Sequence, residues 1–90
     1  MIEVGKRYYF ICDPYYHFIG EVTAVLGIRR VACREVVQVH SSNRNWTQFF
    51  AQGAGTVSRI DTIGTTADMA YLVAHDWPHP IPQPSKERRP

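Results

Sequence analysis

The sequence has little of what marks an exported or membrane-embedded protein. Its two cysteines, Cys12 and Cys33, are too few for a disulfide framework or a cysteine-based metal site. No apolar run approaches the roughly 18 residues that a membrane-spanning helix needs. The opening segment MIEVGKRYYF has no basic region followed by an apolar stretch, so we expect no secretion signal. These absences predict a reduced, cytosolic chain that has no membrane partner.

The body of the chain also lacks net charge. The 90 residues carry 10 basic and 8 acidic side chains, and the excess lies in the final stretch KERRP, where three bases stand beside one acid. Binding of duplex nucleic acid draws its affinity from neutralising several phosphates. A neutral body therefore argues against duplex DNA or RNA as a partner. The hydrophobic share of 44% and the charged share of 20% are those of an ordinary globular domain.

No catalytic or metal-binding signature is present. The four histidines, at positions 17, 40, 75 and 79, have no serine or cysteine beside them in a recognisable nucleophile setting. His75 and His79 have the spacing of a helical metal pair, but the prolines on either side of His79 exclude a helix there. We therefore expect a protein that is not an enzyme and that uses neither cofactor nor metal.

What the sequence does contain is a series of short segments rich in aromatic and β-branched residues. This pattern predicts strands over residues 5–12, 17–27, 28–40, 56–63 and 68–75. The last two are predicted to be joined by a turn at Gly64-Thr65-Thr66. Gly20, inside the second segment, predicts a bulge or a sharp bend in the sheet.

The period of the apolar residues changes to that of a helix in SSNRNWTQFFAQG, residues 41–53. Ser42 or Asn43 is the expected N-cap, and Gly53 stands where a helix commonly ends. Trp46 shares one face with the phenylalanines three and four residues later. We therefore expect a short helix whose tryptophan packs into the core.

Together these segments predict a mainly β protein. The expected fold is a small curved antiparallel sheet, or an SH3-like or OB-like barrel, of about five strands with one short helix. A single domain is expected over residues 1–76, followed by an extended arm over residues 77–90. The arm holds five of the six prolines, which fix φ and keep the segment extended. Because such sheets have edges that natural proteins cover, we also expect a homo-oligomer.

Two groups of residues near the strands and the helix are candidates for ligand binding. Arg44 lies near the start of the helix, where a guanidinium clamps phosphate or carboxylate; the alternative is an exposed arginine with no ligand. Tyr16 and His17 stand at the mouth of the second strand. Rings with polar tips in such a place are typical of base recognition, and equally of protein interfaces.

The arm supplies a third candidate in Trp77 and His79. An indole close to a proline-rich terminus packs its apolar body and finds a partner for its N–H. These two side chains are expected either to line a pocket or a subunit seam, or to fix the arm to its own domain.

Three stretches, YYHFIGEVTAV, VHSSNRNWTQFFAQG and WPHPIP, together resemble a family of small proteins of tailed bacteriophages. Its members show an aromatic residue or His followed by Gly in a strand, an Arg-aromatic helix ending in Gly, and a Trp-x-His-x-x-Pro element. The resemblance spans most of residues 8–84 in the same order. The central strand departs from the family, which places an acidic-Ala-aromatic segment where this chain has Arg34-Glu35-Val36-Val37.

The resemblance implies a phage protein that acts in the infected host's cytoplasm or in the virion. One hypothesis is an oligomer that sequesters a small nucleotide-type immune signal, such as a cyclic nucleotide or an ADP-ribose derivative. Its ligand site would be formed by Tyr16, His17, Arg44, Trp46, Trp77 and His79. The alternative is a virion decoration, cement or connector protein that uses its arm to bind neighbouring capsid subunits.

Overall fold

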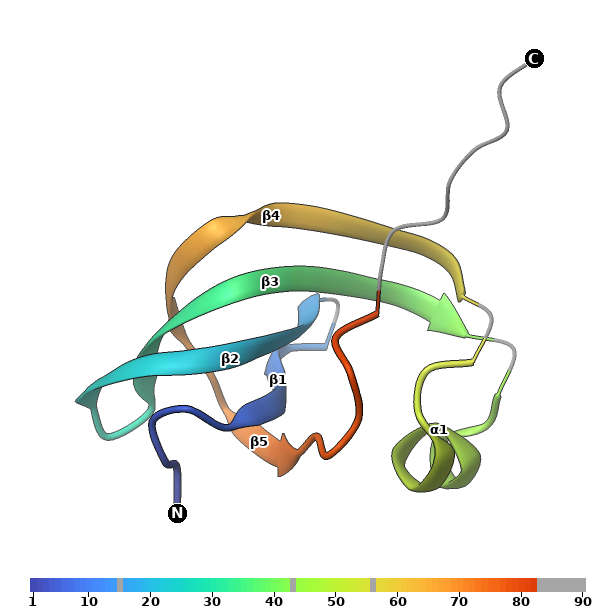
Figure 1. The fold of residues 1–90 in the computed structure, drawn as a ribbon, viewed down its shortest axis with the longest axis horizontal. Helices are drawn as coiled ribbons and strands as arrows, with labels where there is room; N and C mark the ends of the chain where they lie inside the picture. Colours follow the sequence, from blue (N-terminus) through green and yellow to red (C-terminus); the bar gives the residue numbers. More distant parts are fainter. Residues whose placement is uncertain (15, 43, 56, 83–90) are drawn as a thin grey trace.

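The computed structural model describes residues 1–14, 16–42, 44–55 and 57–82, and of residues 40–42 and 57–67 it describes the backbone alone. These residues form five strands and one helix (Figure 1). The predicted mainly β fold, a curved antiparallel sheet with one short helix, is confirmed. The sheet does not close into a barrel, since its strand order β4-β3-β2-β1-β5 leaves β4 and β5 as edges.

The first three strands form a continuous antiparallel meander, as the sequence predicts. They are β1 (Arg7–Asp13), β2 (Tyr16–Gly27) and β3 (Arg30–Ser42). A two-residue turn at positions 28 and 29 joins the long strands β2 and β3. The helix α1 (Trp46–Gln52) follows β3, at the opposite end of the molecule from this turn (Figure 1).

The last two strands differ from the prediction. The strand β4 (Val57–Ala70) runs unbroken through the glycine and threonines at which a turn was expected, so that prediction is wrong. Pairing with β3 explains the difference, because Gly64 lies opposite Val36 inside the ladder. The chain instead leaves the strand at Tyr71 and Leu72, and then forms β5 (Val73–Asp76).

The short link between β4 and β5 shows how strongly the sheet curls. Only two residues separate these strands in sequence, yet they form opposite edges of the sheet. The link is held by two backbone hydrogen bonds: Tyr71 N–H donates to the carbonyl of Arg29 at 3.0 Å, and Leu72 N–H to that of Ile11 at 2.9 Å. The curl thus brings the β2–β3 turn and the start of β5 together.

The bend predicted at Gly20 is present, and a bulge in β3 accompanies it. Between the pairs Ile19–Val37 and Glu21–Arg34, two residues of β3 oppose the single residue Gly20. One of the two, Glu35, has a φ of 55°, which is unusual for a residue with a side chain. A Cβ on Gly20 would lie 3.1 Å from side-chain atoms of both Cys33 and Val36, so glycine permits this close approach.

Consecutive residues of β1 are buried on opposite faces of the sheet. Tyr8 and Phe10 belong to one apolar cluster, which the curled sheet encloses with Val22, Val31, Cys33 and Val36. Tyr9 belongs to a second cluster on the other face, together with Phe49 of α1 and Trp77. A strand buried on both faces requires a cover on each side. Here α1 and the segment after β5 cover the second face.

The first part of the predicted arm lies against this second face. Trp77 is only 2% exposed, and its backbone N–H extends the β1–β5 ladder by donating to the carbonyl of Arg7 at 3.0 Å. The indole N–H donates to the carbonyl of Pro80 at 3.1 Å, which closes a local loop. Ile81 packs on the same cluster. The remainder of the arm, residues 83–90, lies outside the described residues.

Candidate ligand-binding cleft

A small cleft with aromatic walls opens beside α1 on the second face of the sheet. It has a volume of about 220 Å³ and is lined by Tyr9, Ile11, His17, Trp46 and Phe50. The only polar side-chain groups in this lining are the ring nitrogens of His17 and Trp46 and the hydroxyl of Tyr9. The cleft therefore offers contact to a flat, largely apolar group.

Strand alternation and helix periodicity together place these side chains. Tyr9 and Ile11 are two residues apart on β1 and so point to the same face. His17, on β2, lies directly opposite Ile11 in the antiparallel register. Trp46 and Phe50 are four residues apart on α1 and so share one helix face.

The start of α1 is held by a capping box. Asn45 accepts from the backbone N–H of Gln48 at 2.9 Å, and the Gln48 side chain accepts from the backbone N–H of Asn45. The prediction of an N-cap at Ser42 or Asn43 is wrong, since the observed cap, Asn45, lies two or three residues later. Asn43 lies outside the described residues, and the observed cap fixes Trp46 as the first residue of the helix.

Trp46 forms an exposed wall of the cleft, and the prediction that it packs in the core is wrong. Its side chain is 57% exposed, whereas Phe49 is completely buried. The helix has only two turns, so Phe49 at its centre reaches the core while the first residue lies at the rim. The indole stacks on Phe50 with ring centroids 5.8 Å apart and contacts Tyr9 edge-on at 6.0 Å.

Tyr9 and His17 form a hydrogen-bonded pair at the base of the cleft. The Tyr9 hydroxyl lies 2.6 Å from Nδ1 of His17. Burial raises the pKa of Tyr9, and burial also lowers the pKa of His17, although nearby Asp13 acts weakly in the opposite direction. Tyrosine therefore keeps its proton and donates it to a neutral imidazole. The remaining imidazole proton is then on Nε2.

Of the six residues predicted to bind ligand, the structure brings two, His17 and Trp46, into this cleft. Tyr16 is adjacent in sequence but does not line it; its side chain is 51% exposed, and its backbone N–H donates to Asp13. The strand alternation that points His17 into the cleft points its neighbour elsewhere.

Arg44 lies outside the cleft and interacts with the end of the helix. Its guanidinium Nη1 donates to the carbonyl of Gly53 at 2.8 Å. This bond joins the segment before α1 to the residue that follows it. Arg44 thus stabilises the geometry of the helical loop, and it is half-buried, unlike the exposed arginine of the ligand-free alternative.

Trp77 and His79 contact the residues that form the cleft. The Trp77 ring packs against Phe49 with centroids 5.0 Å apart and against Tyr9 at 6.1 Å. Nε2 of His79 lies 2.9 Å from the carbonyl oxygen of Phe50, to which it donates. Both side chains therefore fix the position of lining residues, and neither lines the cleft itself.

Three lining residues were not predicted from the sequence: Tyr9, Ile11 and Phe50. A usable signal was present for two of them. Phe50 stands four residues after Trp46, and Tyr9 lies on the face of β1 opposite to Tyr8 and Phe10. Neither was predicted to line a cleft, because no local pattern shows which face of a strand the helix will cover.

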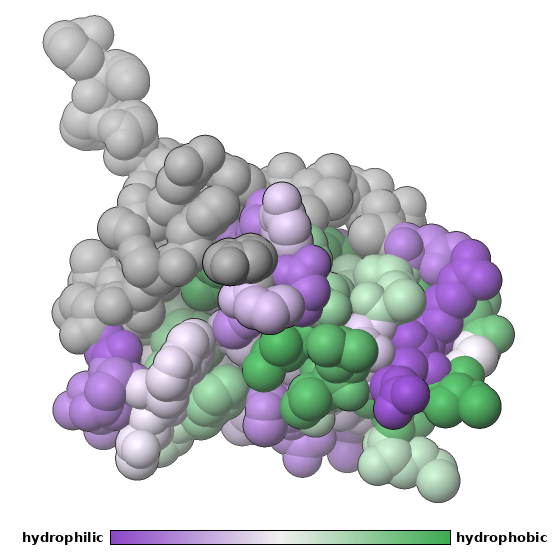
Figure 2. All heavy atoms as spheres, turned by 180° about the vertical axis from the view of Figure 1, so that it is seen from behind, coloured by the Kyte–Doolittle hydropathy of each residue, from purple (hydrophilic) through white to green (hydrophobic). Residues whose placement is uncertain are grey.

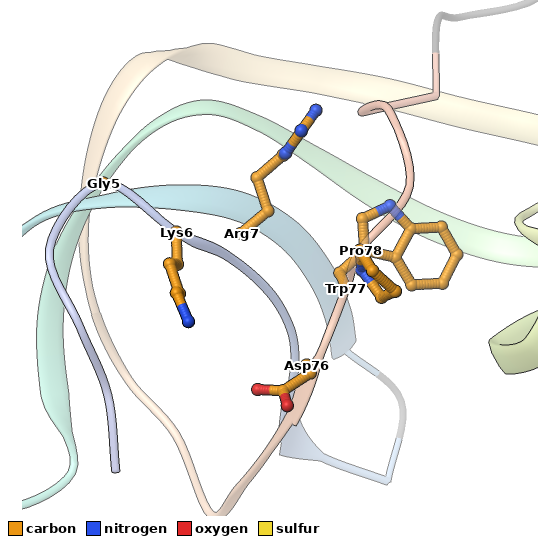
Figure 3. A pocket seen from close by; sticks show the side chains of 6 residues that line it. All are labelled: Gly5, Lys6, Arg7, Asp76, Trp77 and Pro78. Carbon is orange, nitrogen blue, oxygen red and sulfur yellow. The ribbon is translucent and has the colours of Figure 1, made fainter.

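A second hollow lies at the junction of β1 and β5. It has a volume of about 300 Å³, and its charged lining residues are Lys6, Arg7 and Asp76 (Figure 3). The Arg7 side chain points away from the other two in this view, so the cationic groups do not converge on one point. Lys6 also forms an ion pair with Glu3 at 3.5 Å. We therefore do not regard this hollow as an anion site.

The cysteines do not form a reactive centre. Both are free; burial raises the pKa of Cys12 to about 11 and that of Cys33 to about 12, so both thiols stay protonated at neutral pH. Within the described segments, no group of three or more His, Cys, Asp or Glu side chains is arranged to hold a metal ion. The described part of the chain also contains no helix of the length and apolarity that crossing a membrane requires.

No protein-family model, curated protein or solved structure matches this chain. The resemblance to small phage proteins therefore stays a prediction.

Proposed function

We propose that this chain is a non-enzymatic binding protein whose aromatic cleft takes the flat ring of a small nucleotide-type molecule. The observation that carries the proposal is the exposed Trp46, which stacks on Phe50 beside the Tyr9–His17 pair. Aromatic side chains bind bases because every base offers a π-face. A tryptophan that is more than half exposed at the rim of such a cleft leaves part of its ring free for this contact.

The cleft fits a ring and not a whole nucleotide. Its volume of about 220 Å³ lies below the roughly 300–1,000 Å³ of pockets that enclose drug-sized ligands. The sugar and phosphates of a bound nucleotide would therefore extend into solvent. The Nε2–H of His17 would donate to a ring nitrogen or carbonyl of the base. Arg44 has no part in this proposal.

The resemblance to small phage proteins suggests which class of ligand the cleft binds, namely nucleotide-type immune signals. A protein that sequesters an immune signal in the infected host's cytoplasm needs affinity for that signal and performs no reaction on it. Cyclic nucleotides and ADP-ribose derivatives are the signals we propose. The alternative function in the virion relies on an arm that reaches capsid subunits. Since residues 77–82 pack on their own core, no observation favours it.

The test is thermal unfolding of the purified protein against a panel of cyclic di- and trinucleotides and ADP-ribose derivatives. A ligand present at about 100 times its Kd should add about 2.7 kcal/mol of stability. The variant Trp46→Ala should lose about 1–3 kcal/mol of binding, measured by calorimetry, because a base–aromatic stack is worth that much.

Val4→Ala is the matched control. Val4 is about as exposed as Trp46, at 61%, but precedes β1 and does not line the cleft. Its affinity should equal that of the unaltered protein. A panel without any stabilising member, or a ligand that Trp46→Ala binds unchanged, would rule out the proposed site.

A further inference from the structure

Large apolar side chains are exposed at the end of the molecule opposite α1. Val25 lies near the end of β2, Ile28 in the β2–β3 turn and Leu72 in the link between β4 and β5, and all three line one groove. Ile28 is 94% exposed and Leu72 60%. Single exposed apolar side chains are ordinary on soluble proteins, but neighbouring ones mark interaction sites. We call these three residues the turn-end patch.

The two segments of the turn-end patch are neighbours in space. The hydrogen bond from Tyr71 N–H to the carbonyl of Arg29 links the segments directly. A groove of about 570 Å³ lies between them, with Tyr8, Ile28 and Leu72 among its walls. Viewed from behind, apolar side chains stand in two groups on the described surface, with polar side chains between them (Figure 2). Val25, Ile28 and Leu72 are thus exposed apolar side chains in the wall of one groove.

Two charges of opposite sign flank the same groove. Arg29, on the turn, and Asp76, at the end of β5, are both exposed lining residues. Neither belongs to the three ion pairs found among the described side chains, which join Lys6 to Glu3, Arg30 to Asp68 and Arg34 to Glu21. A patch that carries one positive and one negative group around an apolar centre complements itself under two-fold symmetry.

We propose that the turn-end patch binds a second copy of this chain in a two-fold symmetric dimer. In this dimer Ile28 and Leu72 of each copy enter the groove of the other. Arg29 of each copy meets Asp76 of the other, so the same ion pair forms twice. Since β5 is an edge strand of the sheet, the dimer also covers an edge that natural proteins protect.

The proposed dimer leaves the aromatic cleft open. Tyr8 lines the groove and Tyr9 lines the cleft, and these consecutive residues of β1 point to opposite faces of the sheet. Dimer formation and ligand binding are therefore separate properties, and each can fail without the other.

Sedimentation equilibrium over about 1–200 µM tests the proposal, since weak self-association falls in this range. We expect a mass of twice 10.3 kDa at the upper end. Ile28→Lys should raise the dissociation constant by about tenfold or more, because it places a charge in an apolar centre. Ile28 is almost fully exposed, so the variant should fold normally. Thr47→Lys, an exposed position on α1, is the control and should dimerise unchanged.

Charge reversal identifies the pair of residues that meet. Arg29→Asp and Asp76→Arg should each weaken self-association, because each places like charges opposite one another twice. Mixed in equal amounts, the two variants should form a heterodimer that contains two ion pairs. One pair joins the two unaltered residues, Arg29 and Asp76, and the other joins the two substituted positions, with the charges exchanged. A chain that stays monomeric at the highest concentration, a dimer unaffected by Ile28→Lys, or a mixture no more associated than its components would overturn the proposal.

Discussion

At the residue scale, the Tyr9–His17 pair shows how burial decides a protonation state. An exposed histidine takes up a proton near pH 6.5, but His17 is partly buried among rings, and its pKa is lowered. Its Nδ1 accepts from Tyr9, whose own pKa is raised by burial. Both shifts favour the neutral, hydrogen-bonded pair. Protonating His17 would turn Nδ1 into a donor, so the Tyr9 hydroxyl would have to accept from it instead of donating to it.

This pair predicts a dependence of stability on pH. Because the folded-state pKa of His17 is lowered, the unfolded chain binds the proton more readily. The contribution of His17 to the free energy of unfolding should therefore be constant above the pKa of this histidine in the unfolded chain, which is about 6.5. It should fall as the pH drops below that value, and level off once the pH is below the folded-state pKa. Urea unfolding between pH 5 and pH 8 measures this.

The variant His17→Gln isolates that contribution, because glutamine retains an acceptor for the Tyr9 hydroxyl and does not titrate. Its free energy of unfolding should depend less on pH below 6.5 than that of the unaltered protein. Parallel profiles for the two proteins would show that His17 contributes nothing to the acid sensitivity.

At the element scale, the bend of the sheet depends on two residues with opposite properties. Gly20 has no side chain where β2 approaches β3 most closely, and Glu35 adopts a left-handed conformation in the bulge across from it. The sequence indicated the bend through the glycine, which is unusual inside a strand. It did not indicate that the extra residue of the bulge lies in β3, because nothing local marks a glutamate that must adopt positive φ.

Substitution of Glu35 tests how much the bulge is strained. Glycine tolerates positive φ, but it loses more chain entropy on folding than glutamate does. Glu35→Gly should therefore raise the free energy of unfolding by no more than about 1 kcal/mol. Valine, branched at Cβ, should lower the free energy of unfolding by about 1–2 kcal/mol. Chemical denaturation measures both. A valine variant as stable as the glycine variant would show that the bulge is not strained.

The bounds of the strands show how far local sequence pattern predicts secondary structure. Alternation of apolar residues predicted β1, β2 and β3 to within a few residues, since each is long and bounded by clear breakers. The break between the last two strands was predicted at residues 64–66, but it lies at Tyr71 and Leu72. Glycine and threonine side by side resemble a turn locally, and only pairing with β3 keeps them extended.

At the scale of the whole molecule, the segment after β5 is part of the core. Trp77 fills the space between the sheet and α1, and His79 holds the backbone of Phe50. The proline-rich composition predicted an extended segment that docks on a surface. As far as residue 82, that surface is the chain's own second face.

Two truncations test the contribution of this segment. Removing residues 83–90 retains the buried Trp77 and the packed Ile81, so it should lower the free energy of unfolding by less than the longer truncation. Removing residues 77–90 should lower it by about 3–5 kcal/mol, because a fully buried tryptophan is lost. Trp77→Ala in the full chain should reproduce most of that loss. A shorter truncation as damaging as the longer one would contradict this account.

The sequence by itself determined the types of the elements, because helix and strand periods, caps and breakers are properties of neighbouring residues. It also indicated two of the cleft residues, His17 and Trp46, as rings beside polar groups. Tertiary structure alone decided the rest. Arg44 binds the carbonyl of Gly53 across the helical loop, and Trp77 lies in the core because the second face of the sheet needs a cover. Which side chains remain available to a ligand depends on that cover, and contacts between distant segments leave no local trace.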